Sequence, residues 1–121
     1  MNISERLTTI ADRLAPPATP AALSTGYDFK PDLHFSECRV VNVGTTQGNV
    51  RLRLMRRDGV ELAASTNTLS PSQGTTISEI LTAPSAAVWC RFEPQSPGME
   101  LRASLNISPP GGTSIVVREA R

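Results

Sequence analysis

The chain has 121 residues, a length that suits one domain, and its 39% hydrophobic and 19% charged residues are typical of a soluble globular protein rather than a disordered or membrane-spanning one. Its formal net charge of +1 argues against a protein whose main task is to coat nucleic acid or another polyanion. One histidine and two cysteines exclude most metal sites and most histidine-dependent catalytic triads.

The N-terminal residues predict a short amphipathic helix on an extended arm. Over residues 3–14, apolar side chains recur at helical spacing and form one stripe, and Pro16 and Pro17 end the pattern. Residues 15–26 are rich in proline and small side chains, as in a semi-extended linker. We therefore expect an arm over residues 1–26 that docks on a partner or on another copy through its apolar stripe, namely Ile3, Leu7, Ile10 and Leu14.

Residues 27–121 predict a β-sandwich domain. Polar and apolar residues alternate with period two in short segments that are separated by Gly and Pro. This pattern predicts an all-β fold, an antiparallel sandwich of about seven strands of the immunoglobulin or fibronectin type III kind. A small closed barrel is the rival architecture. The expected strands are residues 38–43, 50–55, 60–64, 75–81, 87–92, 100–107 and 113–118.

A tight hairpin is expected between the second and third of these strands. The dipeptide Asp58-Gly59 lies between them and is typical of a type I′ turn, in which both central residues have positive φ.

The two cysteines fall on the inward phase of their predicted strands. In a seven-strand sandwich, the strands that hold Cys38 and Cys90 lie in opposite sheets and face each other across the core. Two interpretations remain open. The pair forms an inter-sheet disulfide, which would stabilise the fold by about 4 kcal/mol in the loop-entropy model, or it packs as two buried free thiols.

Three segments resemble a known group of proteins. Residues 37–44 (ECRVVNVG), 89–92 (WCRF) and 101–105 (LRASL) are similar to the core pattern of small, mostly exported bacterial β-sandwich proteins of uncharacterised function. The resemblance covers roughly residues 35–118 and lies in core strands rather than in a site. It implies that the two cysteines pair, and it implies no reaction and no catalytic residue.

Catalytic and metal-binding patterns are weak. His34 stands alone next to Asp32, so a blue-copper site, which needs two histidines, is excluded, and a surface histidine is the simpler interpretation. The chain has no Gly-x-Ser-x-Gly nucleophile motif, and its carboxylates form no obvious catalytic pair. We therefore expect no catalytic residue, no metal and no cofactor, and we do not expect an enzyme.

Arginines stand out on the predicted surface. Eleven of the twelve basic residues are arginine, and several share the outward phase of their strands with the single tryptophan. If the strands are ordered as in an immunoglobulin domain, these side chains form one candidate binding face for an anion or a carbohydrate. The alternative is a solvated face with cross-strand ion pairs to Glu93 and Glu100. The candidate face consists of Arg51, Arg53, Arg57, Trp89, Arg91 and Arg102.

The sequence therefore favours a non-catalytic structural or protein-interaction module, which binds a protein partner or self-assembles through its N-terminal arm. A structural component of a virion or secreted particle, and a module that binds anions or carbohydrates, are the alternatives. No segment has the roughly 20 apolar residues that span a bilayer. The cysteine pair favours an extracellular or periplasmic location, although charged residues interrupt the first 14 residues where a secretory signal would be apolar.

Overall fold

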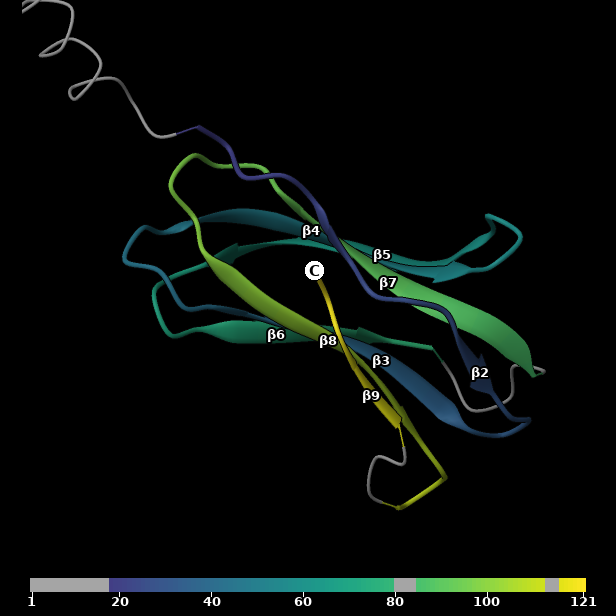
Figure 1. Ribbon diagram of the computed structural model, residues 1–121. Helices are drawn as coiled ribbons and strands as arrows, with labels where there is room; N and C mark the ends of the chain where they lie inside the picture. Colours follow the sequence, from purple (N-terminus) through teal and green to yellow (C-terminus); the bar gives the residue numbers. More distant parts are fainter. Residues whose placement is uncertain (1–17, 80–84, 113–115) are drawn as a thin grey trace, which may run out of the picture.

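The computed structural model describes residues 18–79, 85–112 and 116–121, and all regular structure in these residues is β (Figure 1). The expected helix over 3–14 and the arm residues Ile3, Leu7, Ile10 and Leu14 lie outside the described residues. The strands are β1 (Leu23–Ser24), β2 (Asp28–Lys30), β3 (Phe35–Asn42), β4 (Gly48–Arg56), β5 (Glu61–Leu69), β6 (Gly74–Ser78), β7 (Ala86–Pro94), β8 (Leu101–Ser108) and β9 (Val116–Glu119).

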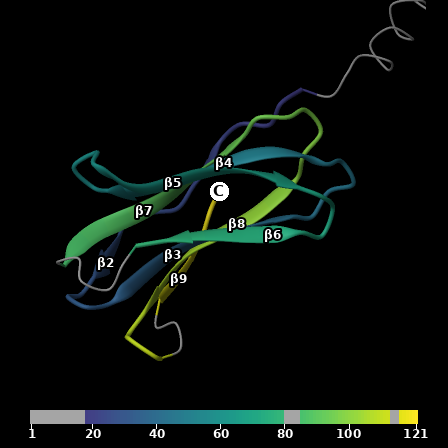
Figure 2. The same cartoon turned by 180° about the vertical axis from the view of Figure 1, so that it is seen from behind.

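The strands form two antiparallel sheets that pack face to face. In the first, called sheet A, the order is β1-β7-β4-β5. β2 pairs with the same edge of β7 as β1, but nearer the start of that strand. In the second, called sheet B, the order is β6-β3-β8-β9. Figure 2 shows the two layers from behind, with β4, β5 and β7 in one and β3, β6 and β8 in the other. The predicted all-β fold in two antiparallel sheets is confirmed, and a closed barrel is not what the described strands form.

The predicted strands β3 to β9 are present, and two further short strands precede them. β1 falls inside the segment that we expected to be a linker. There, Leu23 lies opposite Phe92. One residue further on, the backbone N–H of Thr25 donates to the carbonyl of Cys90 at 2.9 Å, and the N–H of Cys90 donates to Thr25 Oγ1, also at 2.9 Å. The second half of the linker is therefore fixed to the edge of sheet A.

The core between the sheets follows from the alternation of side chains along most of the strands, which breaks at Leu54 and Met55 on β4 and over residues 105–107 on β8. The inward side chains of β4, among them Leu52 and Leu54, are fully buried, and so are those at Val88 and Phe92 on β7. β3 and β8 contribute the facing layer. Burial of these aliphatic and aromatic side chains is the main source of the fold's stability.

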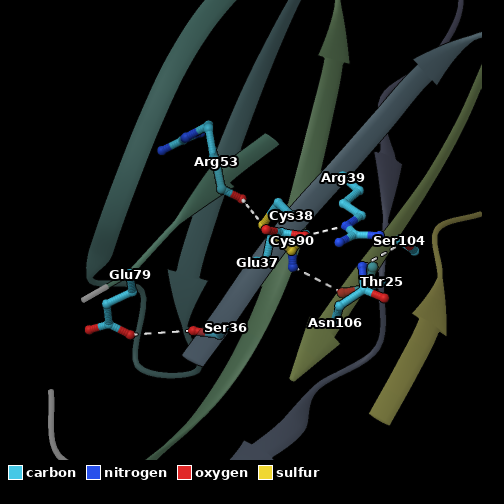
Figure 3. The surroundings of a disulfide bond; sticks show 10 residues. All are labelled: Thr25, Ser36, Glu37, Cys38, Arg39, Arg53, Glu79, Cys90, Ser104 and Asn106. Atoms are coloured by element: carbon cyan, nitrogen blue, oxygen red, sulfur yellow. Dashed lines mark hydrogen bonds and ion pairs between the residues drawn. A yellow bond between two sulfur atoms is a disulfide. The ribbon is translucent and has the colours of Figure 1, made fainter. Parts of the chain in front are cut away.

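The cysteines form a disulfide between the two sheets (Figure 3). Cys38 on β3 and Cys90 on β7 are both fully buried, and their Cα atoms are 5.8 Å apart. Of the two interpretations that the sequence left open, the disulfide is confirmed, and no described cysteine is free.

One strand lies in a different place from the expected one. An immunoglobulin order would put the strand of residues 100–107 beside β7. In the structure this strand, β8, pairs with β3 over eight positions, from Phe35↔Ser108 to Asn42↔Leu101. The edge of β7 that does not pair with β4 is instead paired with β1 and β2. Arg102 on β8 therefore belongs to sheet B, and its predicted place beside the arginines of sheet A was wrong.

The hairpin between β4 and β5 is present, but its predicted turn type was wrong. The N–H of Gly59 donates to the carbonyl of Arg56 at 2.9 Å, and the N–H of Arg56 donates to the carbonyl of Val60 at 2.8 Å. Gly59 has φ +92°, whereas Asp58 is not among the residues with positive φ. This is a three-residue loop in which only the last residue needs the left-handed region, so glycine is required at 59 alone.

Candidate interaction surface on sheet A

The outer face of sheet A is formed by the residues that alternate with the core positions of β4 and β7. Met55 lies opposite Trp89, Arg53 opposite Arg91, and Arg51 opposite Glu93. On β2, Phe29 lies opposite Ala87. This register divides the face along the strands into two regions with different chemistry.

The first region, called the charged half, consists of Arg51, Arg53, Glu61, Arg91 and Glu93. Glu61 Oε1 accepts from Arg53 Nε at 2.8 Å and lies 3.8 Å from Arg51 Nη2. Glu93 Oε1 lies 3.5 Å from Arg53 Nη1, and its Oε2 lies 3.8 Å from Arg91 Nε. Each guanidinium therefore has a carboxylate beside it, and three cations with two anions leave one positive charge on this half.

The arginines of the charged half interact mainly with carboxylates of the protein itself. The hydrogen bond from Arg53 to Glu61 raises the pKa of Arg53, burial opposes the rise, and the charges of Glu61 and Glu93 add to it. The guanidinium is consequently a fixed cation that is already neutralised by its neighbours. An incoming anion would have to compete with these carboxylates.

The second region, called the aromatic end, consists of Tyr27, Phe29, Met55, Arg57 and Trp89. The ring centroids of Tyr27 and Trp89 are 6.1 Å apart with an interplanar angle of 80°, an edge-to-face contact. The Arg57 guanidinium carbon lies 5.5 Å from the centroid of the Tyr27 ring, a cation–π distance. Met55, which lies opposite Trp89, is buried, whereas Tyr27 is 53% and Phe29 60% exposed. The aromatic end is therefore a preformed apolar surface with one cation.

The structure brings together five of the six residues that the sequence predicted for one face. Arg51, Arg53 and Arg91 lie in the charged half, and Arg57 and Trp89 lie at the aromatic end. Sequence reasoning missed Tyr27 and Phe29 as parts of this surface. Their spacing of two residues gave their common direction, but only the pairing of β2 with β7 places them beside Trp89.

Arg102 lies in a groove on the outer face of sheet B. The groove has a volume of about 670 Å³. Its lining includes Arg39, Val41, Thr76, Arg102 and Ser104, and Glu119 supplies a carboxylate. Arg39 in turn forms an ion pair with Glu37. None of the described residues that line this groove is aromatic, so a ligand there would lack the stacking platform that the aromatic end offers.

The remaining chemistry-bearing residues have structural partners. The Nδ1 atom of His34 lies 3.1 Å from the backbone oxygen of Asp32, and both cysteines are in the disulfide. Within the described ranges, no group of three or more His, Cys, Asp or Glu side chains could hold a metal ion. In that same part of the chain, no helix has the length and hydropathy to cross a membrane.

Comparison with known proteins supports the fold alone. No family model and no curated protein matches the chain. The crystal structure of Thermotoga maritima 1070 is similar with a TM-score of 0.56 at 9% identity, covering 84% of this chain and 92% of that chain. The Anabaena sensory rhodopsin transducer gives a TM-score of 0.46 at 7% identity, covering 74% of this chain and 91% of that one. FlgD from Xanthomonas campestris, a protein of flagellar hook capping, gives 0.36 at 7% identity, covering 83% and 67%. The first similarity shows a shared fold, whereas the other two are too weak to show one.

Proposed function

We propose that this chain is a non-catalytic interaction module that binds protein through the aromatic end of sheet A. The observation that carries this proposal is the exposure of Tyr27 and Phe29 beside Trp89 and Arg57. Tyrosine, tryptophan and arginine are the residue types that most often dominate the binding energy of protein interfaces. The contact between Tyr27 and Trp89 holds the rings in place before a partner arrives, which reduces the entropic cost of binding.

The charged half fits the role of a rim in this proposal. Polar and charged residues at the edge of an interface set orientation and association rate more than affinity. Its paired arginines support protein binding over the binding of a free anion, because each already has a carboxylate neighbour. We therefore rank the anion- or carbohydrate-binding alternative below protein binding.

The non-catalytic part of the proposal rests on how the reactive residues are used. Neither cysteine is a free thiol, and the ring of His34 lies against the Asp32 backbone rather than against a nucleophile. General acid–base or nucleophilic catalysis needs such a pair within hydrogen-bond reach. We further propose that the protein works in an oxidising compartment, where its disulfide persists.

Photo-crosslinking in cells of the source organism tests the proposed surface. A photoreactive phenylalanine analogue at Phe29 is expected to give a protein adduct of defined mass. The matched control carries the same analogue at Val117, which is also 60% exposed but lies on β9 of sheet B. Adducts at 29 and not at 117 would support the proposal. No adduct at 29, or the same adducts at both positions, would contradict it.

A further inference from the structure

We propose that the protein bound at the aromatic end presents an aspartate or glutamate side chain to Arg57. This inference rests on the proposed function and names the chemistry that the partner brings to the same surface. It follows from one difference between Arg57 and the other arginines of sheet A and its hairpin.

Arg57 differs from these arginines because its charge has no counterion. Among the described residues, no carboxylate lies within ion-pair distance of Arg57, and no group accepts a hydrogen bond from its side chain. A guanidinium keeps its charge at physiological pH and carries five N–H donors, so this cation has both charge and donors to spare. Each of the other arginines forms an ion pair, namely Arg51, Arg53, Arg56 and Arg91.

The contact with Tyr27 holds Arg57 in place without neutralising it. The guanidinium carbon of Arg57 lies 5.5 Å from the centroid of the Tyr27 ring, and that ring in turn contacts Trp89 edge to face. An aromatic ring attracts a cation through its quadrupole but carries no net charge. Arg57 is also exposed. Its donors are therefore positioned at the surface, where a carboxylate can accept two of them at once.

The strand register places this cation within reach of the same short segment that would cover Phe29. Phe29 lies opposite Ala87 on one side of β7, and from the other side the N–H of Arg57 donates to the carbonyl of Ala87 at 2.9 Å. Two strand spacings separate the backbones of Phe29 and Arg57, about 10 Å, which an extended segment covers in about three residues. One segment can therefore place an apolar side chain on Phe29 and a carboxylate on Arg57.

The charge of the whole outer face of sheet A favours an acidic partner. The charged half carries one excess positive charge, and Arg57 adds a second. A positive face speeds the approach of an acidic surface and repels a basic one. Glu61 and Glu93 already lie against arginines, so they offer little attraction to a basic partner.

Crosslinking from Phe29 tests the inference when it is combined with two matched substitutions. The photoreactive analogue at Phe29 is introduced into the wild-type, Arg57→Gln and Arg91→Gln chains, and the adduct is quantified in extract of the source organism over a range of NaCl concentrations. At low salt, Arg57→Gln should lower the yield at least about fivefold, because the partner's carboxylate loses its cation. Arg91→Gln removes the same charge from the same face and should change the yield less than about twofold.

The salt dependence separates a charge contact from a merely structural role of Arg57. The yield of the wild-type chain should fall as salt rises, whereas that of Arg57→Gln should change little. Equal yields in Arg57→Gln and Arg91→Gln, or a wild-type yield that is independent of salt, would overturn the inference and leave the proposed function standing. Absence of any adduct from the wild-type chain would instead contradict the proposed function itself, so the two failures are distinguishable.

Discussion

The charged half and the aromatic end occupy one face of one sheet, yet they differ in what they leave available. In the charged half, Arg53 lies between Glu61 and Glu93, and its charge is largely used inside the protein. At the aromatic end, Tyr27 and Phe29 remain exposed after all contacts within the described residues are made. The two regions therefore differ in which side chains already have a partner inside the protein, and the proposed function rests on that difference rather than on the number of arginines.

The largest expected effect comes from the disulfide on which both regions depend. Replacing both cysteines, as Cys38→Ala/Cys90→Ala, should lower the free energy of unfolding by about 4 kcal/mol, because the closed loop no longer restricts the unfolded chain. Urea unfolding of this variant, compared with the oxidised wild type in the absence of a reducing agent, checks the value. A loss below about 1 kcal/mol would show that the sheets hold together without this link.

A smaller loss of unfolding free energy is expected for substitutions on β4, and it should differ between the strand's buried and exposed faces. Leu52 is fully buried, whereas its neighbour Arg53 lies in the charged half. Leu52→Ala should cost about 3 kcal/mol of unfolding free energy through lost burial and a cavity, and Arg53→Ala less than about 1 kcal/mol. Denaturant midpoints of the two variants measure the difference. Equal losses would contradict the division between core and surface.

The ion pairs of the charged half should contribute little. Glu61→Gln removes a carboxylate beside two arginines, but the side chains are partly exposed and solvent screens them. The expected loss is below about 1 kcal/mol, and it should fade at high salt. Thermal unfolding at low and high ionic strength tests this. A loss that is large and independent of salt would mean that the charged half supports the fold.

The smallest effect is a pH dependence at the hairpin. The hydrogen bond from Arg56 lowers the pKa of Asp58, and burial opposes it only in part. A carboxylate with a lowered folded-state pKa stabilises the fold above its unfolded-state pKa, and this contribution is lost as the pH falls through the folded-state value. Asp58→Asn should therefore be less stable than the wild type at neutral pH and converge with it in acid. Urea midpoints across the acid range test this, and parallel curves would contradict it.

Alternation allowed the sequence to predict the strands and the facing positions of the cysteines, because period two is a local property. The partner of each strand is a long-range property, and it could not be read in the same way. β8 pairs with β3 rather than β7, so Arg102 moved to the other sheet. β1 and β2 are too short to give a pattern, and one lies in a proline-rich segment. The sequence therefore did not predict that Tyr27 and Phe29 belong to the same surface as Trp89.

The most direct measurement compares two neighbours on β7 that belong to different regions. The crosslinker is placed at Phe29, and its adduct is quantified in Trp89→Ala and Arg91→Ala backgrounds, each first shown to unfold cooperatively in urea. If the aromatic end is the binding surface, Trp89→Ala should abolish the adduct and Arg91→Ala should retain it. Loss of the adduct in Arg91→Ala with retention in Trp89→Ala would instead place binding in the charged half.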